Sequence, residues 1–352
     1  MTEEGEKEKE RKKNGIMEVR APGVVKLFGE HAVVYGKRAI AAAVDMWATA
    51  VAEKLNGRNI SISMPDLDFE SEFSCREAGE AYERYLSEDI GKIGKDYERL
   101  KLPYMVIIGR LLKLTKNGTG LKLKISSNIP LQKGFASSGA CSTAAAIAAE
   151  KLFGASLDYN EIIDIARDGE RIMHLNKNAG AIDVSTTFYG GIVSYKAGSI
   201  VRHNEIKNGI ELVIIDTGPK KSTAETVGHV SELYNKDRKH AEEILAQIDG
   251  CSDEGLDALR KSDMARLGKA MSRNHELLKM LGVSSKGLDL AVSEGIGNGA
   301  YGVKLSGGGG GGIAIAVPSD RELLIKTMNE LGFKAYPTKI AKDGAVSFVG
   351  PG

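Results

Sequence analysis

Three stretches of the sequence gather residues that could handle a phosphate group. The first, "PLQKGFASSGA", leads into an alanine-rich segment that begins at Ser137 and is typical of a helix. A helix N-terminus exposes unpaired N–H groups and about half a positive charge, so it attracts anions. With Gly134 allowing close approach of the backbone, this stretch predicts a phosphate site. Simple capping of the helix by a serine is the alternative interpretation.

The second stretch, "KLSGGGGGGIAIAV", holds six consecutive glycines between two apolar runs. Glycine loses more backbone freedom on folding than any other residue, so the run needs a physical reason. A dinucleotide-binding fingerprint opens a helix, whereas this run precedes an alternating segment that indicates a strand. The run therefore predicts either a flexible hairpin loop or a turn that passes close to another backbone or a ligand.

The third stretch, "APGVVKLFGEHAVVYGK", places Lys26, Glu30 and His31 among apolar residues. Burying a charge without a partner is costly, so these side chains need either partners or a function.

Two carboxylates follow in "GERIMHLNKNAGAIDVSTTFYGG". Glu170 and His174 stand four residues apart in a helical pattern, a spacing that suits a metal but is also common by chance. Asp183 stands alone in a neutral segment that we predict as a loop, where an aspartate usually caps a turn.

The elements that must position these residues alternate between strands and helices. Strand patterns cover residues 15–29, 38–54, 60–65 and 120–130, helical patterns cover 96–118, 137–154 and 157–174, and residues 190–203 read as a hairpin. A buried strand at 209–218 then precedes helices up to about residue 297. Strands flank the glycine run, and a helix at 319–332 and strands at 333–338 and 344–350 follow. These patterns predict an α+β chain in two parts joined near residues 197–210.

Composition narrows the classes of function. With 352 residues, 42% hydrophobic and 27% charged, the chain has the make-up of a globular protein large enough for two domains. A net charge of +1 provides no field that would favour nucleic acid or an anionic membrane. Residues 1–15 mix both signs of charge and predict a disordered extension. Scattered cysteines, without a signal peptide or a membrane-spanning run, predict a reduced cytoplasmic protein.

In their order along the chain, the three stretches resemble the signature motifs of the GHMP small-molecule kinases. "FGEHAVVYGK", "GERIMH", "AIDVSTTFYGG" and "DTGPKKSTAETV" resemble the mevalonate kinases of that family, in their archaeal or bacterial form. The resemblance implies ATP-dependent phosphorylation of the primary hydroxyl of mevalonate, giving 5-phosphomevalonate and ADP. It also implies an N-terminal, ATP-binding domain like ribosomal protein S5 over residues 16–203, a C-terminal ferredoxin-like domain over 204–352, and a site in the cleft between them.

The same resemblance implies roles for single residues. Those expected around the ATP phosphates are Gly134, Ala136, Ser137, Ser138 and Gly139. Those expected to hold Mg²⁺ are Ser138 and Glu170, and Asp183 is the expected catalytic aspartate. Those expected on the mevalonate side are Glu30, His31 and Thr223. Those expected to support the phosphate loop are Gly308, Gly309 and Gly310, because a side chain there would push the loop out of place.

The chain departs from the family pattern at the site itself. After "APG" the family has a lysine that polarises the reaction, and this chain has Val24. Lys26 lies two residues along a predicted strand and so shares a face with Val24; it is our candidate for the missing catalytic cation. Lys133 is a second candidate, and a Lys26 side chain that points into solvent is the plain alternative.

These departures leave two other functions open. One is a GHMP kinase acting on a related hydroxy compound, such as a mevalonate phosphate. The other is a weakly catalytic protein that binds a nucleotide or metabolite. The expected partners are ATP with Mg²⁺ and a mevalonate-like small molecule, with neither nucleic acid nor membrane, and a homodimer stays open.

Overall fold

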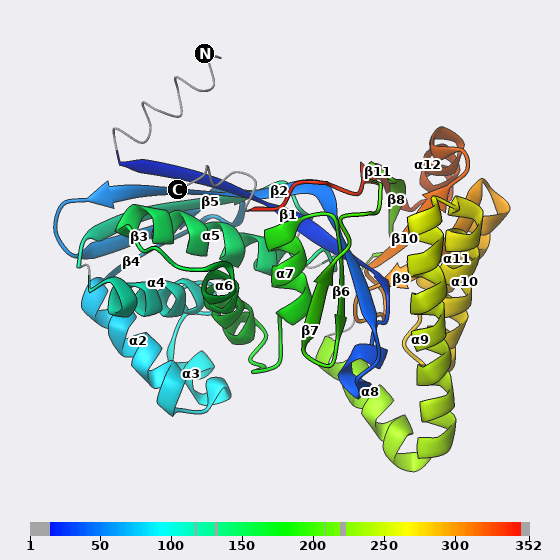
Figure 1. Cartoon of the computed structure of the whole chain (residues 1–352), viewed down its shortest axis with the longest axis horizontal. Coiled ribbons are helices and arrows are strands. Elements are labelled where there is room, and N and C mark those ends of the chain that lie inside the picture. The colour runs from blue at the N-terminus through cyan, green and yellow to red at the C-terminus, as the bar shows by residue number, and fades with distance from the viewer. Residues whose placement is uncertain (1–14, 117, 131–132, 208, 219–222, 346–352) are drawn as a thin grey trace.

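The structure is a computed structural model that describes residues 15–116, 118–130, 133–207, 209–218 and 223–345. Within these residues the chain builds two sheets, each with its own helices, arranged side by side (Figure 1). The α+β prediction is therefore confirmed. None of the helices in the described part combines the length and apolar character that crossing a lipid bilayer requires.

The first sheet is built around one long central strand, β2, and it has seven strands among the described residues. They are β1 (Ile16–Phe28), β2 (Ala39–Leu55), β3 (Asn59–Met64), β4 (Phe69–Ser74), β5 (Gly120–Ser127), β6 (Ile192–Lys196) and β7 (Ser199–Arg202). β1 runs antiparallel along nearly all of β2, whose other edge pairs first with β6 and then with β5. Strand β2 thus pairs with three other strands of the sheet, β1, β5 and β6.

Six helices gather on one side of the first sheet (Figure 1). They are α2 (Cys75–Ser87), α3 (Ile90–Asp96), α4 (Leu102–Thr115), α5 (Ser137–Phe153), α6 (Tyr159–Met173) and α7 (Ala181–Tyr189). The short 3₁₀ helices η1 (Ala32–Tyr35) and η2 (Pro65–Leu67) lie in the connections. Helix α5 is buried along most of its length against β1, β2 and α6, which its small alanine side chains permit.

Helix α7 corrects the sequence analysis, which placed Asp183 in a loop. Its sequence, "AIDVSTTFY", contains β-branched residues with low helix propensity, so local pattern alone did not indicate a helix. Burial of six of its residues between the sheet and α5 outweighs that propensity. Asp183 consequently stands in the first turn of a packed helix, where its position is fixed by the core.

The second sheet is antiparallel, with the order β11–β8–β10–β9. Its strands are β8 (Glu211–Asp216), β9 (Ala300–Ser306), β10 (Ile313–Pro318) and β11 (Lys334–Lys339). Helices α8 (Thr223–Lys236), α9 (Arg238–Lys261), α10 (Met264–Met280) and α11 (Lys286–Gly297) connect β8 to β9, and α12 (Arg321–Glu330) connects β10 to β11. This β-α-β-β-α-β connectivity is the ferredoxin-like one that was expected. The predicted strand at 344–350 lies mostly outside the described residues.

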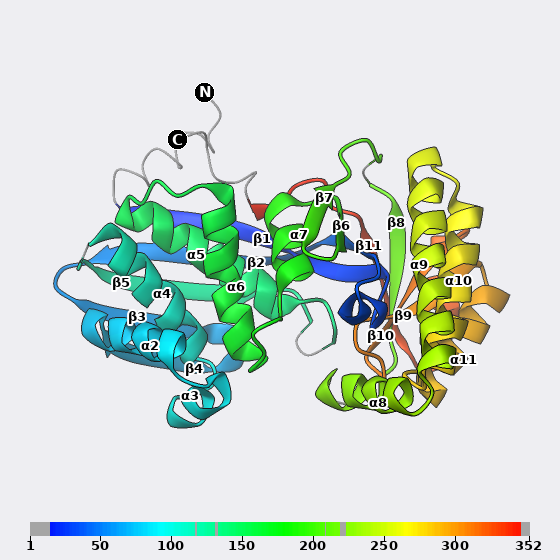
Figure 2. The same cartoon turned by 60° about the horizontal axis from the view of Figure 1, so that its bottom comes forward.

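The end of the described chain returns to the first sheet. In Figures 1 and 2 the segment after β11 runs back toward β1 and β2. Ala341 N donates to Ala43 O, and Gly191 N donates to Ala341 O, each at 2.8–2.9 Å. Residues 340–345 therefore lie against the first sheet, although the sequence analysis had assigned them to the second domain.

Candidate active site

The described end of the predicted phosphate loop, residues 133–136, is a bend that leads into α5. Gly134 and Ala136 both have positive φ, and Ala136 occupies the N-cap position without a side-chain cap. Ser137 and Ser138 therefore open the helix with hydroxyls that do not cap it, which removes the alternative interpretation. Val24 N donates to Phe135 O at 2.8 Å and so fixes the loop on β1. The N–H groups of the first turn of α5 remain available to an anion.

Two carboxylates face the start of α5 from different helices. A Cβ atom added to Gly139 would lie 3.6 Å from Glu170 Cδ and 3.7 Å from Asp183 Cβ. Glu170 is 1% exposed, its Oε1 has no hydrogen-bond partner in the described structure, and its Oε2 lies 3.4 Å from His174 Nε2. Because buried polar atoms are normally satisfied, an unpaired carboxylate oxygen here fits a cation that completes the site.

Lys26 joins this group from β1. Its ammonium forms an ion pair with Asp183, and the two side chains are 18% and 23% exposed. Burial lowers the pKa of Lys26 to about 8, against the carboxylates of Glu30 and Glu170, which raise it. The ion pair excludes the alternative in which Lys26 points into solvent.

Val24 fills the position where the family pattern has lysine. It is fully buried in a small apolar cluster with Ala39, Ala41 and Ile182, against which Ala136 also packs. The uncharged Val24 side chain thus lies in one cluster with Ala136, next to the start of α5, and with Ile182, the residue before Asp183. Lys26, two residues farther along the same strand, brings a positive charge to Asp183 instead.

Lys304 is a site residue that the sequence analysis did not single out. It reaches from β9 to form an ion pair with Glu30 Oε1, and it donates to Leu305 O at 2.6 Å. The Lys304 side chain is 0% exposed and that of Glu30 is 2% exposed, while Glu30 Oε2 has no partner in the described structure. The available signal was a lysine inside an otherwise apolar strand, directly before the glycine run. Glu30 is therefore held by the second sheet rather than left for a substrate alone.

The glycine run divides its contacts among three partners. A Cβ atom added to Gly134 would lie 3.4 Å from Ser306 O, and one added to Gly307 would lie 3.9 Å from Gly134 Cα. Gly308 O accepts from His31 Nε2 at 2.9 Å, and burial lowers the pKa of that histidine, which favours the neutral ring. The first glycine of the run thus lies against the phosphate loop, and the second lies against His31.

The rest of the run turns away from the phosphate loop. Gly310 N donates to Val283 O at 2.8 Å, and a side chain on Gly309 would overlap that carbonyl oxygen. Support of the phosphate loop, expected at residues 308–310, is therefore provided by residues 306–307 instead. Glycine is required at 309 because the backbone there combines a positive φ with close approach to the turn after α10.

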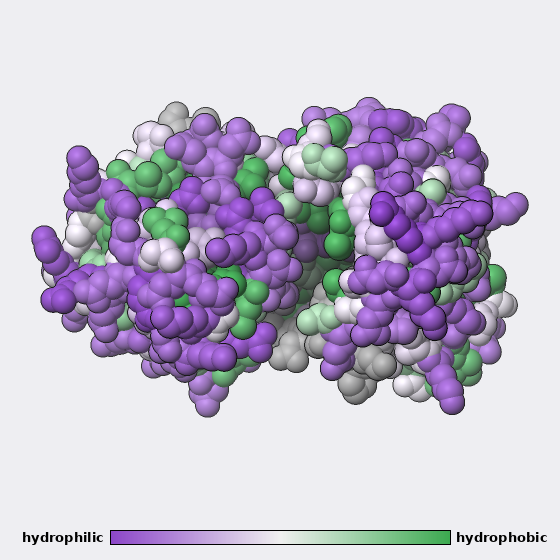
Figure 3. Space-filling model, turned by 90° about the horizontal axis from the view of Figure 1, so that it is seen from below, coloured by the Kyte–Doolittle hydropathy of each residue, from purple (hydrophilic) through white to green (hydrophobic). Residues whose placement is uncertain are grey.

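Two further expected residues lie at the border with the second sheet. Lys133 Nζ lies 2.9 Å from Asp216 Oδ2, at the end of β8. Thr223 is the first residue of α8, and its side chain lies outside the described part of the structure. The molecular surface is hollowed between the two parts (Figure 3).

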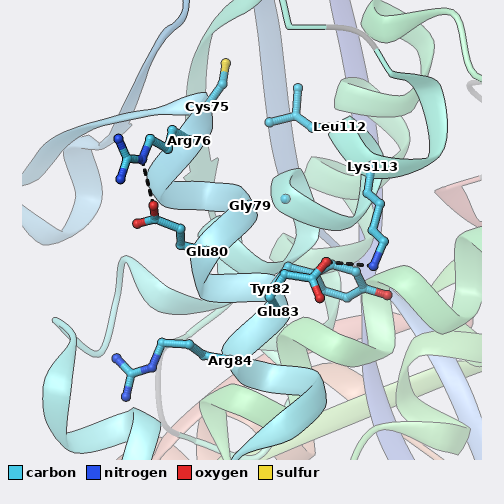
Figure 4. Close-up of a pocket in the computed structure, with 10 residues that line it drawn as sticks. Cys75, Arg76, Gly79, Glu80, Tyr82, Glu83, Arg84, Leu112 and Lys113 are labelled. Atoms are coloured by element: carbon cyan, nitrogen blue, oxygen red, sulfur yellow. Dashed lines mark hydrogen bonds and ion pairs between the residues drawn. The ribbon is translucent and has the colours of Figure 1, made fainter.

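A separate open groove of about 700 Å³ lies between α2 and α4, away from these residues (Figure 4). Its charged side chains pair with one another: Arg76 with Glu80 at 2.7 Å, and Lys113 with Glu83 at 2.6 Å. A surface whose charges are already neutralised offers little to a charged ligand, so we place the chemistry in the cleft.

The donor set of the cleft fits magnesium better than a transition metal. Among the described residues, no three His, Cys, Asp or Glu side chains are placed to hold one metal ion. Mg²⁺ needs fewer protein ligands, because it keeps waters and binds substrate phosphates beside one or two carboxylates. The unpaired oxygen of Glu170 in the described structure suits an ion of this kind.

Comparison with known proteins places this arrangement in one family. The family model described as "GHMP kinases N terminal domain" matches residues 104–191, and "GHMP kinases C terminal" matches residues 256–337. The mevalonate kinase of Thermococcus onnurineus is 31% identical over 92% of this chain and 96% of its own length. That of Methanocaldococcus jannaschii is 32% identical over 89% and 96%.

Solved structures give the same picture. A crystal structure of a mevalonate kinase superposes with a TM-score of 0.77 at 28% identity, covering 93% of this chain and all of the other. Lactococcus lactis galactokinase in complex with galactose shares the fold, with a TM-score of 0.72 at 17% identity over 97% of this chain and 98% of its own.

Proposed function

The chain belongs to the GHMP kinases, and within this family we propose that it transfers the terminal phosphoryl group of ATP to the primary hydroxyl of mevalonate. The products are 5-phosphomevalonate and ADP. Curated mevalonate kinases at about 30% identity over nearly the whole chain support this substrate. The structural observation that carries the proposal is the Lys26–Asp183 ion pair, set beside the unpaired oxygen of Glu170 at the N-terminus of α5.

Phosphoryl transfer depends mainly on positioning and charge neutralisation. In this proposal the N–H groups of residues 137–139 and the backbone around Gly134 hold the ATP phosphates. Ser138 and Glu170 hold Mg²⁺, which neutralises phosphate charge when bound. The Glu170 carboxylate suits this role because one of its buried oxygens has no hydrogen-bond partner among the described residues.

Asp183 accepts the proton of the attacking hydroxyl. Its first-turn position on α7 and its ion pair with Lys26 hold the carboxylate beside the start of α5. Lys26 then stabilises the negative charge that develops on the reacting oxygens, in place of the lysine that the family carries at position 24. A protein that only bound nucleotide would have no use for such a pair beside the phosphate loop.

The acceptor side is formed by His31, Glu30 and Thr223 in this proposal. His31 and Glu30 sit at the end of β1, held from the second sheet by Gly308 O and Lys304. A polar acceptor with a carboxylate and hydroxyls suits these donors and acceptors. A cytoplasmic location and a homodimer stay predictions of the sequence.

The test is an ADP-release assay with mevalonate, phosphomevalonate, galactose and homoserine, each against an acceptor-free blank. We expect mevalonate to give the highest kcat/KM, and Asp183→Asn to abolish most of that signal. A higher kcat/KM with another acceptor would replace the substrate assignment. ADP release no faster than the blank with every acceptor would instead support a binding protein.

A further inference from the structure

Lys133 carries a positive charge on the phosphate loop itself, directly before Gly134. Its Nζ lies 2.9 Å from Oδ2 and 3.1 Å from Oδ1 of Asp216, the last residue of β8. The pair therefore joins the phosphate loop of the first sheet to a strand end of the second. The Lys133 side chain is 30% exposed and that of Asp216 is 12% exposed, so the lysine keeps access to solvent.

Asp216 does not depend on Lys133 for its place in the fold. It also accepts from Gly218 N at 2.9 Å, and its backbone position is fixed by pairing with Ile313 and Lys334. A partly exposed lysine–aspartate pair contributes little to stability, since solvent screens it and ordering the long side chain costs entropy. Lys133 is thus free to exchange this carboxylate for a more highly charged partner.

Two other lysines placed at the site, Lys26 and Lys304, are less exposed than Lys133. Lys26 is paired with Asp183, and Lys304 is enclosed with Glu30 at 0% exposure. The first turn of α5 is formed by uncharged residues, "SSGA". Lysine binds phosphate as a compact point charge, and Lys133 lies on the loop expected to surround the phosphates.

We propose that Lys133 is an ATP-binding residue that rests on Asp216 in the empty site and transfers to the polyphosphate of the nucleotide when ATP enters. Asp216 is then the resting counter-ion, and it competes with ATP for the lysine. The inference rests on the proposed function only in taking ATP as the phosphoryl donor.

The experiment compares Lys133→Met with Asp216→Asn, measuring the Kd of ATP by calorimetry without any acceptor and the kcat with mevalonate. We expect Lys133→Met to raise the Kd of ATP about tenfold or more, since a hydrogen bond to a charged group is lost. We expect Asp216→Asn to leave that Kd unchanged or to lower it, because Asn still accepts from Gly218 N but releases the lysine.

Two further variants control for folding and for bulk charge. Lys133→Arg keeps the charge and should restore most of the affinity lost in Lys133→Met. Lys122→Met removes an exposed lysine from β5, on the same sheet, and should leave the Kd of ATP unchanged.

Two outcomes would overturn the proposal. If Lys133→Met and Asp216→Asn raise the Kd of ATP by the same factor, the pair is only a latch between the two parts. If Lys133→Met leaves that Kd unchanged, Lys133 does not touch the nucleotide. Failure of wild-type protein to phosphorylate mevalonate would count against the proposed acceptor alone, because ATP binding is measured without it.

Discussion

Helix α6 buries two carboxylates two residues apart, and their surroundings differ sharply. Asp168 is 2% exposed and accepts from Tyr85 Oη at 2.8 Å, from Arg110 at 2.6 Å and from Arg171 at 2.7 Å. Glu170 is 1% exposed, yet one of its oxygens has no partner among the described residues. Burial has removed both carboxylates from water, but among the described residues only Asp168 has protein hydrogen bonds to both of its oxygens.

The difference separates a structural carboxylate from the one that we propose as a ligand of Mg²⁺. Asp168 connects α6 to α2 and α4 and uses its acceptors fully, as buried polar groups normally do. Glu170 faces α5 and α7, where a bound cation would complete its bonding. An arginine of α6 also supports the side of the helix on which Glu170 lies. Arg167 Nε donates at 2.9 Å to Ala179 O, in the segment that leads into α7. The face of α6 with Asp168 therefore packs the helix against α2 and α4, and this packing fixes the position of Glu170 on the other face.

The largest effect that tests this contrast is expected from a substitution of Asp168. Asp168→Asn leaves Arg110 and Arg171 with a charge that is no longer matched, and losing one partner of a buried pair costs about 3 kcal/mol or more. We expect a loss of that size in the free energy of unfolding, measured by urea denaturation, with kcat unchanged below the transition. Asp164→Asn is the matched control, since Asp164 pairs with the same arginines at 45% exposure and should cost far less. A large loss of kcat at unchanged stability would contradict this assignment.

Asp183→Asn should have the converse effect. Removing the proton acceptor is expected to cost less stability than Asp168→Asn, because both members of its pair with Lys26 are partly exposed, at 18% and 23%. It is expected to lower kcat at least about 100-fold, or about 2.7 kcal/mol of barrier, while the Kd of ATP changes little. Single-turnover kinetics with mevalonate and calorimetry with ATP measure the two quantities. Near-normal turnover in this variant would remove Asp183 from the mechanism.

Lys26→Met tests whether the cation has moved along β1. We expect kcat to fall by about tenfold or more, because a charge aimed at the developing phosphoryl charge is worth at least about 1.4 kcal/mol. Adding Val24→Lys to that variant should recover part of the loss if the two positions are equivalent. In the wild-type background Val24→Lys should lower the melting temperature instead, since it places a charge in a fully buried apolar cluster. If Lys26→Met is silent, the cation comes from elsewhere.

Glu170→Gln sharpens the contrast with Asp168. The variant removes a charge that the protein itself does not satisfy, so stability should be unchanged or slightly higher. The Mg²⁺ concentration for half-maximal activity should rise, by about tenfold for the loss of one ligand interaction of about 1.4 kcal/mol. A loss of stability with unchanged Mg²⁺ dependence would make Glu170 a structural partner of His174.

The smallest expected effect is one of pH. Lys26 has a pKa lowered to about 8 by burial, and its useful form is the protonated one. The charged fraction is therefore full well below that value and is lost as pH rises through it, so kcat at pH 8 should be about half of its value at pH 6.5. Lys26→Arg, which stays protonated, should move this decline to higher pH or remove it. An unchanged profile in that variant would assign the decline to another group.

Local pattern predicted much of the fold. Period-two alternation located β3 and β5, and the alanine-rich run with a glycine behind it located α5. Family resemblance provided the ferredoxin-like arrangement of the second sheet. Helix α7 could not be predicted in this way, because packing rather than propensity makes it a helix.

The candidate site was predicted less completely. Asp183, Glu170 and the phosphate loop were named in advance, and the structure brings them together around Gly139. The pairing of Lys304 with Glu30 and the contact of Gly309 with Val283 depend on residues far apart in the chain. A local pattern contains no information on which distant partner a buried charge or a glycine meets.

The hydrogen bonds of Ala341 have a consequence for synthesis on the ribosome. Ala43 O, in the middle of the first sheet, receives its bond from a residue that is made about 300 residues later. Until Ala341 is made, the carbonyl of Ala43 and the N–H of Gly191 lack these hydrogen-bond partners. Unpaired backbone groups at a sheet can bind a strand of another chain. The first part of the protein is thus translated early and completed last, so a nascent chain that stalls in the second part remains open to misassembly.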